Sequence, residues 1–241
     1  PILLSAQTDK KFYFENISIP DGLSNTQVWD IKQDKYGFLW IGTQDGLNRY
    51  DGYNFKIYKN DPEDNSSLPN NQVQSISIDK DGNFLLGTLS GLSIFDRVSG
   101  TFSLHYPDSN DANSISNNIT KIFEDSQGRI WIGTGRGLFL FNLEQKKFSL
   151  TEIKNNENTI PTDGTVFSIM ETTANEIYAG YLFGGLIKYN ETLNLFELIE
   201  GKSEKKDPLK GNLIFNTFED KTGKLWICTN FGLFTYCLLY T

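Results

Sequence analysis

Short runs of alternating hydrophobic and polar residues, separated by turn residues, recur along the whole chain. The pattern is clearest where Ile119 opens one run, Asp125 and Gly128 bound a turn, and Trp131 lies in the next run. Asp-x-x-Gly is typical of a turn, because the aspartate accepts hydrogen bonds from nearby backbone amides and the glycine supplies positive φ. The alternation predicts strands at 119–124, 130–134 and 138–142 and a fourth near residue 148.

The same pattern occurs five times, and the copies span residues 28–58, 73–104, 119–150, 166–198 and 214–237. Positions 40, 85, 131, 178 and 226 share the tryptophan site, so successive copies are 45, 46, 47 and 48 residues apart. The fourth copy is the most degraded, with Asn175 at the turn glycine, Tyr178 at the tryptophan site and one extra residue before Gly185. Repeats of this length with several short strands predict four-stranded β-propeller blades.

The predicted fold is therefore all-β: a β-propeller of five four-stranded blades in one domain, residues 12–241. The fifth copy lacks a clear outer strand, and residues 12–17 have the pattern of a strand without a partner. We expect this segment to complete the last blade and close the ring, which would hide two sheet edges. The alternative is an open arc whose exposed edges pair with another copy as a homodimer. Residues 1–11 are read as either the remnant of a secretory signal or a frayed end.

Composition limits the partners of this domain. The chain has 241 residues, is 38% hydrophobic and carries a net charge of -8, which argues against nucleic acid or an anionic membrane surface as a partner. No apolar run approaches the roughly 20 residues that cross a bilayer, so we expect no membrane contact by this segment. Hairpin spacing places Cys228 opposite about Leu233 and Cys237 opposite about Lys224, too far out of register for a disulfide, so free thiols are expected.

Copies one and three contain Asp-x-x-Gly-x-x-Trp-x-Gly-Thr, then Gly-Leu and an aromatic-Asp/Asn pair. This combination resembles the two-component-regulator propeller repeat in the periplasmic sensor regions of Bacteroidetes hybrid histidine kinases. Residues 45–55 are similar to the opening blade of such sensors, and residues 21–24 to the lead-in before it. The resemblance implies the N-terminal part of a periplasmic sensor that binds polysaccharide-derived oligosaccharides and signals to a kinase. We expect no enzymatic activity in this chain, because His105, its one histidine, lacks the context that phosphotransfer requires.

In a propeller, the loops that lead into the inner strands share a face with the loops that join the second and third strands, and ligands usually bind there. Amide and aromatic side chains on that face suit a sugar, whose hydroxyls need donors and acceptors and whose ring faces stack on apolar planes. Ordinary loop polarity, or a core position for the tryptophan, is the competing interpretation of each residue. The candidate ligand-binding residues are Arg136, Phe231, Asn230, Gln44, Asp45, Phe183 and Trp29.

Other functions find less support in the sequence. No metal or other cofactor is expected, because a single histidine falls short of the ligands that zinc needs and each acidic turn offers too few oxygens for calcium. The Asp-x-x-Gly turns resemble those of sialidases only distantly, and no pair of carboxylates stands at spacing that indicates an acid/base couple. The alternative to a sensor is a protein-interaction scaffold without a small ligand, which would expose a contiguous apolar patch.

Overall fold

The computed structural model describes residues 13–79, 82–107, 115–154, 164–182, 184–199, 209 and 212–237. Short 3-10 helices at Ile19–Asp21 and Ile115–Asn117 precede the first and third sheets. The strands of these residues form five sheets, which we call blades 1 to 5 in chain order.

Apart from one added strand in blade 4, each blade is an antiparallel sheet in which consecutive strands are neighbours. Blade 1 contains β1 (Val28–Gln33), β2 (Leu39–Thr43), β3 (Gly46–Tyr50) and β4 (Phe55–Tyr58). Blade 2 contains β5 (Val73–Ile78), β6 (Phe84–Thr88), β7 (Gly91–Asp96) and β8 (Thr101–His105). Blade 3 contains β9 (Ile119–Glu124), β10 (Ile130–Thr134), β11 (Gly137–Asn142) and β12 (Lys147–Leu150). These bounds confirm the strands predicted for the third copy.

Blades 4 and 5 depart from the four-stranded plan. Blade 4 contains β14 (Val166–Glu171), β15 (Ile177–Tyr181), β16 (Gly185–Asn190) and β17 (Leu195–Leu198), and β13 (Ile153–Lys154) pairs with β17 in parallel. The chain that leaves blade 3 therefore adds a fifth strand to the outer edge of blade 4. Within the described residues, blade 5 contains only β18 (Ile214–Glu219), β19 (Lys224–Thr229) and β20 (Gly232–Cys237).

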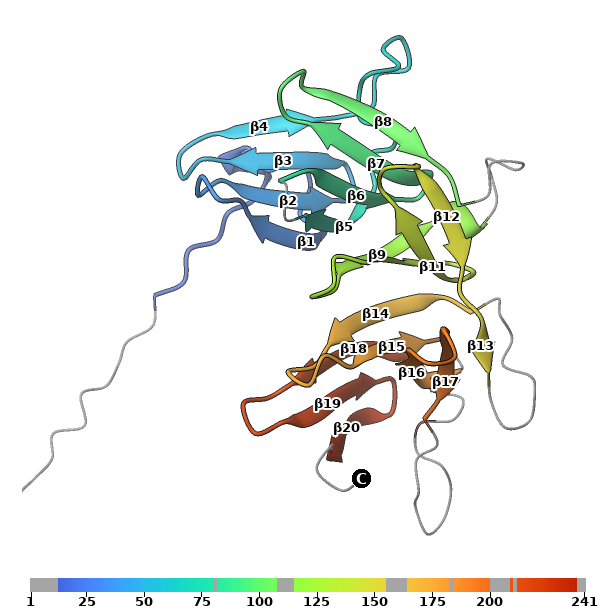
Figure 1. Cartoon of the computed structure of the whole chain (residues 1–241). Coiled ribbons are helices and arrows are strands. Elements are labelled where there is room, and N and C mark those ends of the chain that lie inside the picture. The colour runs from blue at the N-terminus through green and yellow to red at the C-terminus, as the bar shows by residue number, and fades with distance from the viewer. Residues whose placement is uncertain are drawn as a thin grey trace, which may run out of the picture.

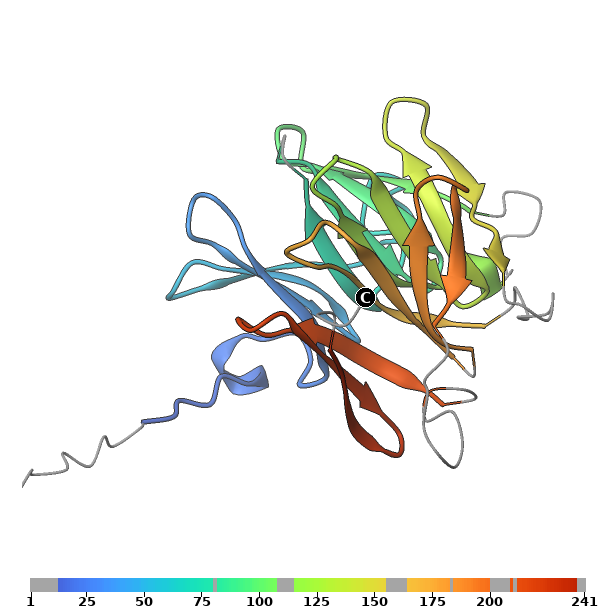
Figure 2. The same ribbon diagram turned by 60° about the horizontal axis from the view of Figure 1, so that its bottom comes forward.

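The first strands of the blades pack side by side in the order β1, β5, β9, β14, β18 and form the centre of the molecule. The later strands of each blade lie progressively farther out, as Figure 1 shows for β4, β8 and β12. These repeated antiparallel sheets confirm the all-β class and, for three of the sheets, the predicted four strands. Figure 2 shows the same arrangement from the side on which blade 5 comes forward.

The tryptophan site fills the space between consecutive blades, as predicted. Trp40 packs with Val73 and Phe84 of blade 2, and Trp131 packs with Val166 and Tyr189 of blade 4. Trp40, Trp131 and their substitutes in blades 2 and 4 are fully buried. Burying aromatic side chains of this size is a large share of the stability of a sheet-on-sheet interface.

The glycine of the Trp-x-Gly-Thr segment is required because the next inner strand comes very close to it. A Cβ at Gly42 would lie 2.7 Å from the carbonyl oxygen of Val73, and one at Gly180 would lie 2.5 Å from a methyl carbon of Ile214. The equivalent glycines of blades 2 and 3 face Ile119 and Val166 in the same way. Blade 5 has the exposed Cys228 at this position.

The predicted closing strand is not formed. Residues 13–17 contain no strand, and in the part of the chain that the structure describes the sheet of blade 5 consists of β18, β19 and β20. Residue 12 lies outside the described residues. Tyr13 and Phe14 alternate like strand residues but are almost fully exposed, and the segment leads away from the sheets in Figures 1 and 2. Alternation alone does not make a strand where no sheet edge lies alongside to pair with it.

Both ends of the row of blades expose side chains whose counterparts at the internal junctions are buried or partly buried. Ile31 on β1 is 53% exposed, whereas its counterpart Ile76 on β5 is fully buried. Phe218 on β18 is 64% exposed. The predicted register of the cysteines is confirmed, since Cys228 pairs with Leu233 and Cys237 with Lys224 in the β19–β20 hairpin. Cys228 is a free thiol.

Candidate functional site

The loops at one end of the blades contact one another as the repeat predicts. The backbone N–H of Gln44, in the β2–β3 hairpin, donates to Gln27 O at 3.1 Å, just before β1. Gly135 N donates to Asn118 O at 2.9 Å in blade 3, and Asn230 N donates to Leu213 O at 3.3 Å in blade 5. We call the surface formed by these hairpins and lead-in segments the loop face.

A β-bulge interrupts every inner strand near the loop face. In β1 the pairing with β2 passes from Val28 directly to Asp30, and the same shift occurs in β5, β9, β14 and β18. A bulge leaves one residue unpaired and redirects its side chain, and bulges are enriched next to functional sites. The unpaired residues, which we call the bulge row, are Trp29, Gln74, Thr120, Phe167 and Phe215.

Three side chains of the bulge row, those of Gln74, Thr120 and Phe167, contact the following blade. Gln74 Nε2 donates to Asn118 Oδ1 at 3.0 Å, and the Thr120 hydroxyl donates to Val166 O. The rings of Phe167 and Phe215 lie 6.3 Å apart at their centroids. Trp29 is 48% exposed, Phe167 37% and Phe215 50%. The row therefore offers three accessible aromatic faces and two polar side chains at one end of the molecule.

The structure divides the predicted ligand-binding residues into two groups. Asp45 forms an ion pair with Lys59 at 2.5 Å, and Asn230 Oδ1 accepts the N–H of Leu213 at 2.9 Å, so both side chains hold the loops in place. Gln44 and Arg136 are exposed on hairpins of the loop face, and Phe231 is 74% exposed. Trp29 belongs to the bulge row. Phe183 lies outside the described residues.

The other members of the bulge row are not among the ligand-binding residues predicted from the sequence. Gln74, Thr120, Phe167 and Phe215 are each the second residue of an inner strand, a position that the repeat motif does not specify. The residue types at this position vary among the blades, so the sequence carries no signal that marks them. Their role as ligand contacts stays a prediction.

At the opposite end of the blades, the aspartate turns have a structural task. Asp34 Oδ2 accepts the indole N–H of Trp40 at 2.8 Å, and its Oδ1 accepts the backbone N–H groups of Tyr36 and Phe38. Burial alone would raise the pKa of Asp34, but these hydrogen bonds and the charge of Arg97 bring it below its ordinary value. Asp125 and Asp220 bind the indoles of their own blades at 2.8 and 2.7 Å. The hydrogen bonds of these three carboxylates thus stabilise the fold.

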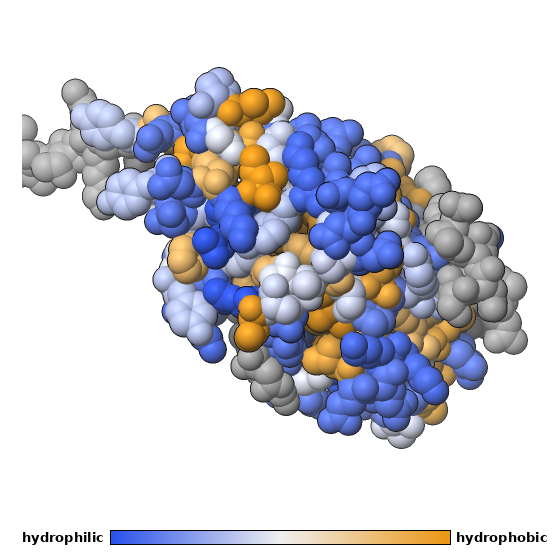
Figure 3. Space-filling model, turned by 90° about the horizontal axis from the view of Figure 1, so that it is seen from above, coloured by the Kyte–Doolittle hydropathy of each residue, from blue (hydrophilic) through white to orange (hydrophobic). Residues whose placement is uncertain are grey.

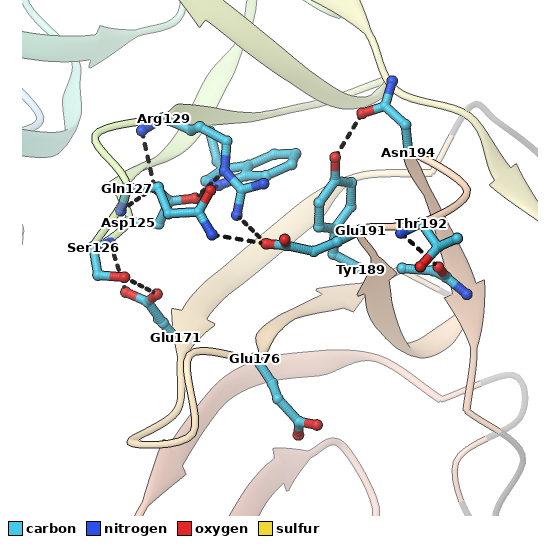
Figure 4. A network of polar contacts seen from close by, with 12 residues as sticks. Asp125, Ser126, Gln127, Arg129, Glu171, Glu176, Tyr189, Glu191, Thr192 and Asn194 are labelled. Atoms are coloured by element: carbon cyan, nitrogen blue, oxygen red, sulfur yellow. Dashed lines mark hydrogen bonds and ion pairs between the residues drawn. The ribbon is translucent and has the colours of Figure 1, made fainter.

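Polar contacts also join consecutive blades at this end, and Figure 4 shows those between blades 3 and 4. Arg129 bridges Asp125 at 2.6 Å and Glu191 at 3.0 Å. Glu171, the last residue of β14, accepts the N–H and the hydroxyl of Ser126 at 2.8 and 2.6 Å. Glu219, at the end of β18, binds Thr173 of blade 4 in the same manner. An acidic residue that ends an inner strand thus secures the turn of the preceding blade.

The described residues contain neither a cluster placed to bind a metal ion nor a helix that could span a membrane. No cluster of three or more histidine, cysteine, aspartate or glutamate side chains is placed to hold a metal ion there. His105 contacts Ser103 Oγ at 3.1 Å, and burial together with nearby Lys146 lowers its pKa. Within the same residues, no helix is long and apolar enough to cross a membrane. The outer surface in Figure 3 is mainly hydrophilic, with smaller hydrophobic patches between.

The repeats match a known family. The model of the two component regulator propeller matches residues 22–45, 67–90 and 113–136, each of which joins a lead-in segment to the following hairpin. The chain carries repeats of this family. Histidine kinase P4 of Formosa agariphila is 54% identical over 67 residues, which are 28% of this chain and 5% of the kinase.

Solved propeller structures resemble the fold of this chain. The extracellular domain of a B. thetaiotaomicron protein described as a hybrid two component system is 21% identical, with a TM-score of 0.57 over 92% of this chain and 39% of that domain. Virginiamycin B lyase of Staphylococcus aureus is 14% identical, with a TM-score of 0.61 over 89% of this chain and 71% of the lyase. The chain therefore shares its fold with the extracellular domain of a hybrid two component system, and the same fold also occurs in an enzyme.

Proposed function

We propose that this chain is a ligand-binding part of an extracytoplasmic sensor propeller and that it recognises an oligosaccharide derived from a polysaccharide. The observation that carries the proposal is the bulge row, which sets three accessible aromatic rings beside Gln74 and Thr120 at the loop face. Apolar faces of sugar rings stack on aromatic planes, while the hydroxyls need both donors and acceptors. The extracellular origin of the B. thetaiotaomicron domain supports the location.

The fold shared with virginiamycin B lyase does not lead us to propose catalysis for this chain. The turn aspartates bind tryptophan indoles and backbone amides, and general acid/base catalysis needs carboxyl groups that face a bound substrate. The kinase step of a hybrid two component system would be carried out by other parts of the sensor. We therefore propose a role in recognition without catalysis.

Thermal denaturation in the presence of fractionated polysaccharide digests tests the proposal. One class of oligosaccharide should stabilise the protein, by about 2.7 kcal/mol at a ligand concentration a hundred times the dissociation constant. Trp29→Ala and Phe167→Ala should weaken this stabilisation, because each removes a stacking surface of the bulge row. Tyr53→Ala is the matched control, since Tyr53 is 88% exposed but lies in the β3–β4 turn. Equal loss in all three variants would contradict binding at the bulge row.

A protein-interaction scaffold is the second candidate function. Phe218 and Leu233 are more than half exposed on blade 5, and exposed apolar groups of this kind are typical of protein contacts. If this function holds, no digest shifts the melting temperature, and light scattering detects a homodimer or a complex with a partner protein. A monomer that is stabilised by one class of sugar would instead favour the sensor.

A further inference from the structure

We propose that the ligand of the bulge row carries an anionic group, a carboxylate or a sulfate, which Lys121 and Arg136 of blade 3 bind. This inference rests on the proposed function and specifies its substrate class as acidic sugars. Blade 3 differs from the other blades at two equivalent positions, one on the inner strand and one in the hairpin between the second and third strands.

The first difference lies on the inner strand, at the residue after the bulge. Asp30, Ser75, Lys121, Ser168 and Asn216 occupy this position, opposite the glycine of the neighbouring strand in the first four blades and opposite Cys228 in blade 5.

At three of these positions the side chain accepts a hydrogen bond from the next inner strand. Ile76 N donates to Asp30 Oδ2 at 2.9 Å, Ile122 N donates to Ser75 Oγ at 3.1 Å, and Thr217 N donates to Ser168 Oγ at 3.1 Å. A lysine ammonium has donors only and cannot take this role. In blade 3, Lys121 replaces a bond between strands with a positive charge beside Thr120 of the bulge row.

The charge of Lys121 has no counterpart in the described parts of the chain. Its side chain is half-buried, yet it forms none of the ion pairs found there, which involve Lys59, Arg97, Arg129, Lys154 and Lys188. Removing part of a charge from water without a partner is unfavourable. The chain has 30 acidic and 22 basic residues, so acidic side chains outnumber the basic ones that they could pair with. An anionic ligand would provide the missing partner.

The second difference lies in the hairpin between β10 and β11. Gly135 N donates to Asn118 O at 2.9 Å, and the Thr165 hydroxyl donates to Gly135 O at 3.4 Å, so the hairpin is tied to the segments that lead into β9 and β14. Arg136 N donates to Thr134 Oγ1 at 3.0 Å, which fixes the backbone from which its exposed side chain projects.

Arg136 also lacks an ion-pair partner among the residues that the structure describes. The matching hairpins of blades 1, 2 and 5 hold Gln44 and Asp45, Leu89 and Ser90, and Asn230 and Phe231. A guanidinium group can bind a carboxylate or a sulfate through two parallel hydrogen bonds. Blade 3 therefore carries an ammonium and a guanidinium near the loop face, in the blade that precedes Phe167 of the bulge row.

Calorimetric titration with three matched sets of oligosaccharides tests this inference: neutral, uronate-containing and sulfated. We expect an acidic set to bind more tightly than the neutral set, with an affinity that falls as salt is raised. Lys121→Gln and Arg136→Gln should each weaken acidic binding at least about tenfold and leave neutral binding unchanged, and Lys121→Arg should retain it. Preference between the uronate and sulfated sets identifies the anionic group.

Lys147→Gln is the control, because Lys147 is an exposed lysine of the same blade on outer strand β12. Arg136→Gln alters an exposed side chain and tests the inference even if Lys121→Gln disturbs folding. Neutral sugars that bind as tightly as acidic ones, with no effect of either substitution, would overturn the inference and leave the sensor proposal intact. Failure of all three sets to bind would overturn both.

Discussion

Blades 3 and 4 have the same backbone but different chemistry at the turn between their first two strands. In blade 3, Asp125 accepts the indole N–H of Trp131 at 2.8 Å and the backbone N–H groups of Gln127 and Arg129. In blade 4, Thr172 accepts one backbone N–H, that of Glu176 at 3.1 Å. The hydroxyl of Tyr178 donates instead to the Glu176 carboxylate at 2.8 Å.

The backbone of the two turns is nevertheless held by the same hydrogen bonds. Asp125 N donates to Arg129 O at 3.0 Å, and Thr172 N donates to Glu176 O at 2.9 Å. The side chains at the tryptophan site are fully buried in both blades. What the blades share is a tight turn and a large side chain against the next blade, and more than one set of residues provides them. The following substitutions in blades 3 and 4 test which of these shared features contributes most to stability.

Trp131→Ala should have the largest effect. The side chain is fully buried between blades 3 and 4 and contacts the rings of Tyr189 and Phe196. Its loss should lower the free energy of unfolding by about 3–5 kcal/mol, through lost burial and the cavity that remains. Urea denaturation followed by circular dichroism measures the change.

Tyr178→Phe is the counterpart in blade 4, because it keeps the ring and removes only the hydroxyl bonded to Glu176. It should cost about 0.5–1.5 kcal/mol, the typical net value of one hydrogen bond. If the two variants were equally unstable, the polar contact and not the buried ring would dominate this position.

The fold could be predicted from the sequence further than the candidate site. Asp125 and Gly128 mark a turn by themselves, and a two-residue hairpin fixes the pairing of Cys228 with Leu233, so these features follow from local spacing. The parallel pairing of β13 and the unpaired segment 13–17 depend on which sheet edge lies nearby, which local pattern does not encode. Of the predicted site residues, Asp45 and Asn230 hold loops, whereas Trp29 lies in the bulge row. A bulge inserts one residue without changing the motif, so Gln74 and Phe167 carry no distinguishing signal.

Acidification should weaken the contribution of Glu176 in blade 4 to the stability of the protein. Burial alone would raise the pKa of Glu176, but Lys188 at 2.6 Å and the Tyr178 hydroxyl bring it below its ordinary value of 4.5. Its contribution to stability is therefore present above about pH 4.5 and is lost as the pH falls through the lowered folded-state value. Both charged side chains are about one-third exposed, so we expect Glu176→Gln to cost only about 0.5–1 kcal/mol at neutral pH.

Urea denaturation of the wild type and Glu176→Gln at pH 7 and pH 3 measures this effect. The difference between the two proteins should shrink at pH 3, because pH 3 lies below the ordinary pKa of 4.5, so that the unfolded wild type binds a proton there that the folded carboxylate with its lowered pKa resists. A constant difference at both pH values would show that the ion pair with Lys188 does not contribute to the stability of blade 4.

Exchanging the turn residues should have the smallest effect. Gly128 has φ 80° and Asn175 has φ 60°, both in the left-handed region, which glycine occupies without strain and asparagine at a modest cost. Gly128→Asn should lower the melting temperature slightly, and Asn175→Gly should leave it unchanged or raise it slightly, each through a change below about 1 kcal/mol. Differential scanning calorimetry of both variants checks the pair. A large loss of stability in Gly128→Asn would contradict this expectation. It would mean that asparagine, which blade 4 has at this position, cannot replace glycine in the turn of blade 3.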